Sequence, residues 1–126
     1  MSAIEAKGLV KKYGDKTAVR GLDLSVDGEI YGLLGPNGSG KTTTVNMLTS
    51  MLTATEGSAS ICGFDVATQK QEVRECISYV PQSMAVDIRL TGRECVDLFA
   101  KLYGIRDRAE RKRRVAEVLE VMDLTD

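Results

Sequence analysis

Apolar and polar positions alternate near the start of the chain. The alternation is approximate over residues 3–10 and strict over residues 22–26. It is typical of strands that bury one face. Residues 27–29, Asp-Gly-Glu, have the composition of a turn, so the pattern predicts a hairpin over residues 18–34.

The apolar pattern then changes. Residues 30–34, Ile-Tyr-Gly-Leu-Leu, are almost continuously apolar, which is typical of a strand buried on both faces. A further strand is predicted over residues 58–62, and a short apolar one over residues 77–80 that Pro81 ends. We therefore expect an antiparallel layer at the start, followed by the first strands of a parallel core.

Helical periodicity predicts two helices in the first two thirds of the chain. Val45, Leu48 and Leu52 recur at helical spacing and indicate a buried helix of about three turns. Thr68 and Gln71 have capping-box spacing and predict a short helix that follows them.

Two more helices are predicted nearer the end. Thr91 and Glu94 form a second capping box, and Gly104 ends the helix that it opens. The apolar positions of that helix and of the last one are Val96, Phe99, Leu102 and Tyr103, then Val115, Val118, Leu119 and Met122. In the charged run 106–114 acidic residues interleave with basic ones, which favours a solvated helix face over a partner surface.

Composition limits the classes of function. The 126 residues are 43% hydrophobic and 28% charged, and 17 basic residues nearly balance 18 acidic ones. No basic field indicates nucleic acid, and no apolar run approaches the length of a membrane span. With no histidine and only Cys62, Cys76 and Cys95, the sequence indicates neither a zinc finger, a disulfide framework nor a cysteine nucleophile with its base. We expect a cytoplasmic chain.

Residues 35–42, Gly-Pro-Asn-Gly-Ser-Gly-Lys-Thr, match the phosphate-binding loop G-x-x-x-x-G-K-[ST]. Its glycines permit backbone conformations that point successive N–H groups inward, and a helix that begins at Lys41 adds its dipole. Lys41 would neutralise the β- and γ-phosphates, and the Thr42 hydroxyl would bind Mg²⁺. The candidate nucleotide ligands in the loop are Gly35, Asn37, Gly38, Ser39, Gly40, Lys41 and Thr42.

The stretch from Lys11 to Thr44 resembles the opening of the ATPase subunits of ATP-binding-cassette (ABC) transporters. The resemblance runs from about residue 3 to the end, and the segments "LLGPNGSGKTTT" and "LTGRE" are similar to the ABC-2 drug-export, daunorubicin-resistance-like group. It implies an α/β fold: a P-loop NTPase core with an antiparallel β layer and the start of a helical subdomain. Residues 1–82 would be the layer and the core up to the Q-loop, and residues 83–126 the beginning of the helical subdomain.

The resemblance also implies further site residues. Tyr13, about 28 residues before Lys41, matches the aromatic residue that stacks on adenine. Ala18 matches a small residue beside the base, and Thr43 one that touches the α-phosphate. Gln82, in "ISYVPQ", matches the Q-loop glutamine that contacts Mg²⁺ and the attacking water. Lys41 and Gln82 are the catalytic candidates, and ATP and Mg²⁺ the expected ligands.

The same family pattern contains parts that these residues lack. There is no Leu-Ser-Gly-Gly-Gln signature, no apolar run that ends in Asp-Glu, and no switch histidine. We therefore expect an incomplete domain that alone binds Mg-ATP weakly at best and does not turn it over. We also expect an uncovered apolar edge on the strand that precedes the loop.

Function follows from the resemblance as an expectation. The complete domain would hydrolyse ATP as a head-to-tail dimer and drive transport through a separate membrane-spanning partner, from the cytoplasmic face of the membrane. Two alternatives stay open: a soluble ABC-type ATPase in translation or DNA repair, and a truncated fragment that binds ATP without turnover.

Overall fold

The computed structural model describes residues 2–83 and 87–125. The chain divides into two compact units, Met1–Tyr79 and Val80–Asp126. The boundary lies just after α2 (Lys70–Cys76), the last helix of the first unit. Each unit has its own buried residues.

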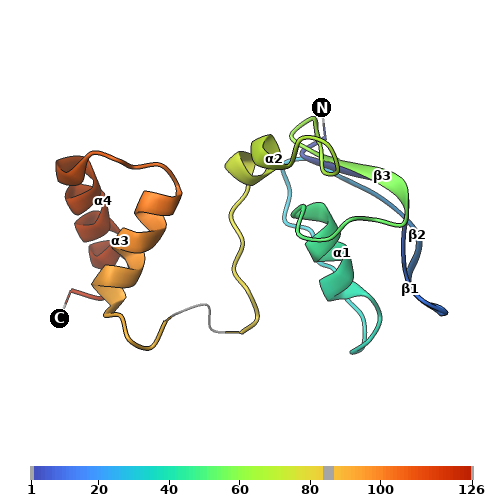
Figure 1. Cartoon of the computed structure of the whole chain (residues 1–126), viewed down its shortest axis with the longest axis horizontal. Helices are drawn as coiled ribbons and strands as arrows, with labels where there is room; N and C mark the ends of the chain where they lie inside the picture. Colours follow the sequence, from blue (N-terminus) through green and yellow to red (C-terminus); the bar gives the residue numbers. More distant parts are fainter. Residues whose placement is uncertain (1, 84–86, 126) are drawn as a thin grey trace. The chain divides into compact units, whose positions relative to one another are not determined.

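The first unit is built on one antiparallel sheet (Figure 1). Its strands are β1 (Ile4–Tyr13), β2 (Lys16–Val26), β3 (Glu56–Ile61) and β4 (Phe64–Asp65). They lie in the order β2-β1-β3-β4, and every neighbouring pair is antiparallel. The strands expected over residues 3–10, 22–26 and 58–62 are thus present.

The hairpin lies elsewhere than the sequence suggested. β1 and β2 form it, and Gly14 and Asp15 are the two-residue turn between Tyr13 and Lys16. Gly14 has a φ of 56°, a conformation that glycine adopts without strain. The expected hairpin over residues 18–34 was wrong, because the chain leaves the sheet after Val26 and residues 30–34 form no strand that pairs back onto β2.

The segment before the phosphate-binding loop is also different. Residues 30–34 and residues 77–80 were expected as strands, and neither is one in the described structure. Ile30 and Leu34 are 104% and 93% exposed. A parallel strand needs a hydrogen-bonded neighbour, and within the described residues none pairs with either segment. The expected uncovered strand edge is therefore not formed either, since the first segment is exposed without being a strand.

Two helices, α1 (Lys41–Leu48) and α2, complete the first unit. The core is apolar and comes from both helices and three strands, and a residue just after β4 adds to it. Its buried members are Ala6, Leu9, Val19, Met47, Ala59, Ile61, Val66 and Val73.

α1 is shorter than the expected three turns. Ser50 has a φ of 61°, and the N–H groups of Met51 and Leu52 both bond to the Asn46 carbonyl, so the helix has ended by this point. Its buried residues are Thr44 and Met47, whereas the expected apolar positions are partly exposed. This helix end could not be predicted from residue type, because the left-handed residue that ends a helix is usually glycine and here it is a serine.

The capping box expected for α2 was wrong. Gln69 precedes the helix without a side-chain cap among the described residues, and the Thr68 hydroxyl instead donates to Asp65 at 3.1 Å. The Asp65 carboxylate also accepts the N–H groups of Ala67 and Thr68 at 2.8 and 2.9 Å. These backbone bonds lower the pKa of Asp65 and make it the organiser of the turn.

The second unit contains α3 (Gly92–Leu102) and α4 (Arg108–Val121). The capping box of Thr91 and Glu94 is confirmed in both directions: Glu94 N donates to the Thr91 hydroxyl at 3.2 Å, and Thr91 N donates to the Glu94 carboxylate at 2.8 Å. Cys95, Val115 and Leu119 are buried where the two helices pack.

Much of the apolar face expected for these helices is exposed. Phe99, Leu102 and Tyr103 are exposed on α3 and just after it, as are Val118 and Met122 on and after α4. Two helices alone bury only the narrow strip at which they meet. No helix in residues 2–83 and 87–125 has the length and apolar character needed to cross a membrane.

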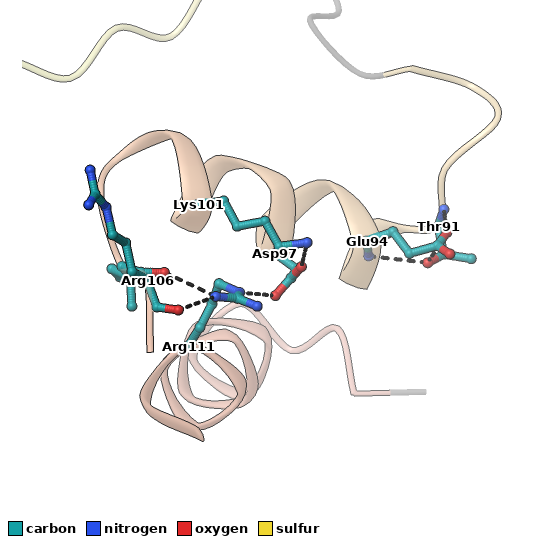
Figure 2. Close-up of polar contacts among 7 residues, drawn as sticks. Thr91, Glu94, Asp97, Lys101, Arg106 and Arg111 are labelled. Carbon is teal, nitrogen blue, oxygen red and sulfur yellow. Dashed lines mark hydrogen bonds and ion pairs between the residues drawn. The ribbon is translucent and has the colours of Figure 1, made fainter. Parts of the chain in front are cut away.

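A polar contact links the two helices (Figure 2). The Arg111 guanidinium donates to Asp97 Oδ1 at 2.7 Å, and to the carbonyls of Ile105 and Arg106 at 3.1 Å each. Lys101 Nζ lies 2.8 Å from the other Asp97 oxygen. The expectation of a fully solvated charge run was therefore wrong at Arg111, whose side chain is only 12% exposed. Along the exposed face of α4, Arg113 forms an ion pair with Glu117, and Arg114 forms one with Glu110.

Candidate functional site

The phosphate-binding loop lies directly before α1, as its sequence predicts. α1 begins at Lys41, and Gly40 precedes it in a left-handed conformation with φ 95°. Among the described residues no side chain caps this helix, so the N–H groups of its first turn are left to bind an anion. The Thr44 N–H and hydroxyl both donate to the Gly40 carbonyl, at 2.9 and 2.8 Å, and fix the junction of loop and helix.

The glycines of the loop serve different purposes. Gly38 has a φ of 82°, which a residue with a side chain rarely adopts. Gly40 combines its positive φ with a close approach: an added Cβ would lie 2.5 Å from the Ala18 carbonyl oxygen. Gly35 does not have a positive φ, contrary to the expectation for all three, and an added Cβ there would instead meet the Ser39 hydroxyl at 2.6 Å.

Strand β2 reaches the loop through an irregularity in its pairing with β1. Lys11 lies opposite Val19 and Lys12 opposite Thr17, so Ala18 is the extra residue on β2. A bulge of this kind turns the backbone out of the regular ladder. Here the backbone carbonyl of Ala18 lies against Gly40, which explains how a strand residue comes to lie beside the loop.

A cleft of about 510 Å³ opens between β2 and the loop. Its walls come from β2, from the segment before the loop, and from the loop and the start of α1. The lining residues are Thr17, Ala18, Val19, Arg20, Gly21, Leu22, Leu33, Leu34, Gly38, Ser39, Gly40, Lys41 and Thr44. The contribution of β2 beyond Ala18 was missed, and the only signal for it in the sequence is Gly21 inside a strand pattern, where φ is 93°.

Lys41 folds back over the loop. Its ammonium group donates to the carbonyl oxygens of Gly35 and Pro36, the second at 2.9 Å. Both partners are neutral, and a phosphate oxygen would be a stronger partner for an ammonium group. The side chain is thus held at the cleft, where it would meet the phosphates of a bound nucleotide.

The structure brings some of the expected site residues together and leaves others apart. Ala18, Gly38, Ser39, Gly40 and Lys41 line the cleft. Thr42 is exposed and Thr43 half-buried on the first turn of α1, outside the lining.

Tyr13 and Gln82 lie outside the cleft lining. Tyr13 is at the end of β1, half exposed, and its register partner is Lys16. Gln82 is exposed and belongs to the second unit, so its role stays a prediction.

The cysteines form no second site. Cys62, Cys76 and Cys95 are free, and among the described residues no three His, Cys, Asp or Glu side chains group as metal ligands. The pKa of Cys76 is raised, mainly by desolvation and secondly by the neighbouring Cys62 thiol. A reactive thiol needs a lowered pKa, so this shift disfavours reactivity.

Comparison with known proteins shows the relationship of the whole chain. The sequence pattern of the family described as ABC transporter matches residues 19–126. The chain is 45% identical over 125 residues to the daunorubicin resistance ATP-binding protein DrrA2 of Streptomyces coeruleorubidus, covering 98% of this chain and 38% of that protein. It is 40% identical to the Nod factor export ATP-binding protein I of Burkholderia orbicola, covering 98% of this chain and 41% of that protein. The chain thus spans about two fifths of the length of these relatives.

Solved structures agree. An ATP-binding subunit of an ABC transporter superposes with a TM-score of 0.81 at 30% identity, covering 98% of this chain and 51% of that one. A dimeric ATP-binding cassette bound to ADP and Pi superposes with a TM-score of 0.77 at 27% identity, covering 93% and 56%. These likenesses confirm the expected fold, a partial P-loop ABC ATPase fold with an antiparallel layer and helices. The chain belongs to the ABC transporter family and covers the N-terminal part of its ATP-binding domain.

Proposed function

We propose that residues 35–43 bind the phosphates of Mg-ATP, and that the chain serves as the N-terminal part of the ATPase subunit of an ABC transporter. The observation that supports this best is the cleft, where the Ala18 bulge, the loop glycines and the Lys41 ammonium group converge at the uncapped start of α1. In this proposal residues 1–82 are the β layer and P-loop core, and residues 83–126 begin the helical subdomain.

Each residue has a distinct role in this proposal. Backbone N–H groups from Gly38 to Lys41 bind phosphate oxygens, and Lys41 neutralises the β- and γ-phosphates. Thr42 and Gln82 contribute oxygen ligands to Mg²⁺, which is held largely through the nucleotide phosphates and so needs no all-protein ligand set. The remaining contacts are those of Tyr13 and Ala18 with the base and of Thr43 with the α-phosphate; Asn37 contributes as part of the loop.

The wider function concerns the complete protein. We propose that the full domain hydrolyses ATP in a head-to-tail dimer and couples it to export through a separate membrane-spanning subunit, at the cytoplasmic face of the membrane. The relatives named above are resistance and export proteins, which favours transport over a soluble ABC-type ATPase.

A binding experiment tests the core of the proposal. Titration of the chain with Mg-ATP should show saturable binding, and Lys41→Met should weaken it by at least about tenfold, because a charge-assisted hydrogen bond is lost. Lys70→Met is the matched control, since Lys70 is the first residue of α2 as Lys41 is of α1. Equal effects of the two substitutions, or no binding at all, would contradict the proposal.

A turnover experiment tests the division of labour. The 126 residues contain no signature motif and no Asp-Glu pair that ends an apolar run, so we expect no release of phosphate from ATP. Phosphate release that disappears in Lys41→Met would show that these residues suffice for hydrolysis, and would refute this part of the proposal.

A further inference from the structure

A cation lies over the aromatic ring at the end of β1. Lys11 Nζ is 5.3 Å from the centroid of the Tyr13 ring. A lysine ammonium within about 6 Å of a ring face is attracted by the ring electrons. One face of Tyr13 is therefore covered by Lys11, while the residue as a whole stays 50% exposed.

Lys11 is itself held in place by the segment that leads into β3. Its ammonium group donates to the Thr53 carbonyl at 2.8 Å. That segment is tied to β1 by two further bonds, from Thr55 N to the Val10 carbonyl at 2.8 Å and from Lys12 N to the Thr55 hydroxyl at 3.0 Å. The cation over Tyr13 is thus held by the Thr53 carbonyl, in a segment that Thr55 ties to β1.

The register of the hairpin places Tyr13 next to the cleft. Thr17 and Ala18 line the cleft, and Thr17 pairs with Lys12. Tyr13 is the next residue along β1, opposite Lys16. Figure 1 shows this hairpin together with α1 in the same unit, and β2 contacts α1 directly. Tyr13 is therefore adjacent in the hairpin to the β2 residues that line the cleft in which the phosphates are proposed to bind.

We propose that Lys11 is a positioning residue for Tyr13: its ammonium group covers one face of the ring and so presents the other face to the base of a bound purine nucleotide. This inference rests on the proposed nucleotide site. A ring already held in its binding orientation loses less side-chain freedom when the base stacks on it, so the affinity for a nucleotide with a base increases. A ligand of phosphates alone gains nothing from it.

Two ligands separate these effects. Mg-ATP carries a base, and Mg-tripolyphosphate carries the phosphates only. Lys11→Met removes the cation with little change in side-chain length, and we expect it to lower the affinity for Mg-ATP by about two- to fivefold. The affinity for Mg-tripolyphosphate should not change, and Lys11→Arg should restore the affinity for ATP, because arginine also places a cation over the ring.

Controls exclude a merely structural effect. Lys12→Met is the matched control, since Lys12 is the neighbouring lysine and pairs with Glu56 at 2.7 Å; its affinity for ATP should equal that of the wild type. In a Tyr13→Ala background, Lys11→Met should have no further effect on ATP. Far-UV circular dichroism checks that each variant is folded. If Lys11→Met is not folded, Lys11→Gln, which keeps a hydrogen-bond donor for the Thr53 carbonyl but removes the charge, takes its place with the same expected result.

The outcomes are distinguishable. If Lys11→Met lowers the affinities for both ligands equally, or does not lower the affinity for Mg-ATP, the role of Lys11 is overturned. Binding of tripolyphosphate with no stronger binding of ATP overturns the roles of both Lys11 and Tyr13 but leaves the phosphate site intact. Binding of neither ligand overturns the proposed function and this inference with it.

Discussion

Replacing Gly40 with alanine tests the contact between the phosphate-binding loop and β2. Gly40 has a φ of 95°, and an added Cβ would lie 2.5 Å from the Ala18 carbonyl oxygen and 3.2 Å from Val19 Cγ2. The first neighbour is backbone in a paired strand, and the second belongs to a core residue. Neither can rotate away, so the loop or the strand has to move.

Two costs add at this position. Left-handed backbone costs an alanine about 1–2 kcal/mol, and overpacking against a rigid neighbour costs about 1–3 kcal/mol. We therefore expect Gly40→Ala to lower the free energy of unfolding of the first unit by about 2–5 kcal/mol, as the sum of these two terms. Affinity for Mg-ATP should fall as well, because the cleft wall is displaced.

The other loop glycines separate the two costs. Gly38 has a φ of 82°, and among the described residues nothing lies within 4 Å of an added Cβ, so Gly38→Ala should cost only the backbone term, about 1–2 kcal/mol. Gly35 has ordinary backbone; the Ser39 hydroxyl can rotate away from an added Cβ, and Ser39 Cβ at 3.2 Å has to shift only slightly, so Gly35→Ala should cost about 0.5–1.5 kcal/mol. Urea unfolding followed by far-UV circular dichroism measures all three. If Gly40→Ala were no more destabilising than Gly38→Ala, the close approach of Ala18 to the loop would be refuted.

Two further predictions concern the second unit. Arg111→Met should lower the free energy of unfolding of the α3–α4 pair by about 2–3 kcal/mol, because charge-assisted hydrogen bonds to Asp97 and two carbonyls are lost. Urea unfolding measures this change. The control is Arg113→Met, which should change the stability little because the ion-pair partner of Arg113 is exposed. Hydrogen bonds from Lys101, and secondly from Arg111, lower the pKa of Asp97. The ionised Asp97 therefore stabilises the folded state at pH values above the ordinary carboxyl pKa of 3.8, and this stabilisation is lost as the pH falls through the lower pKa of the folded state. Acid titration of helix content should therefore show a smaller loss between neutral and acid pH in Asp97→Asn than in the wild type, and an unchanged profile would contradict this account.

Local patterns predicted the elements whose partners are near in sequence. The alternation in β1 and β2 and the capping box of Thr91 and Glu94 each depend on neighbouring residues, and each was found. Elements that depend on distant partners were predicted less well: the strands expected over residues 30–34 and 77–80 have no paired neighbour among the described residues. The hairpin is a local element, but Asp27-Gly28 and Gly14-Asp15 both have turn composition, and the structure uses Gly14-Asp15.

The candidate site shows the same division. The phosphate-binding loop and the start of α1 at Lys41 follow from the motif, because glycine conformation and helix initiation are local properties. The wall that β2 contributes does not follow from it, since a bulge at Ala18 appears only when two strands are paired. The cation above Tyr13 likewise needs Thr53, more than forty residues away, to hold Lys11.

By itself, the sequence determined that a phosphate-binding loop precedes a helix and that the chain resembles ABC ATPases, because both are encoded in residue types at fixed spacing. Only the tertiary structure decided which strands pair, that Ala18 and Gly40 meet, and that residues 30–34 lie exposed. Apolar character shows that a segment favours burial, but a strand forms only where another strand offers its backbone hydrogen bonds. In the described residues that partner exists for β1, β2, β3 and β4, and not for residues 30–34.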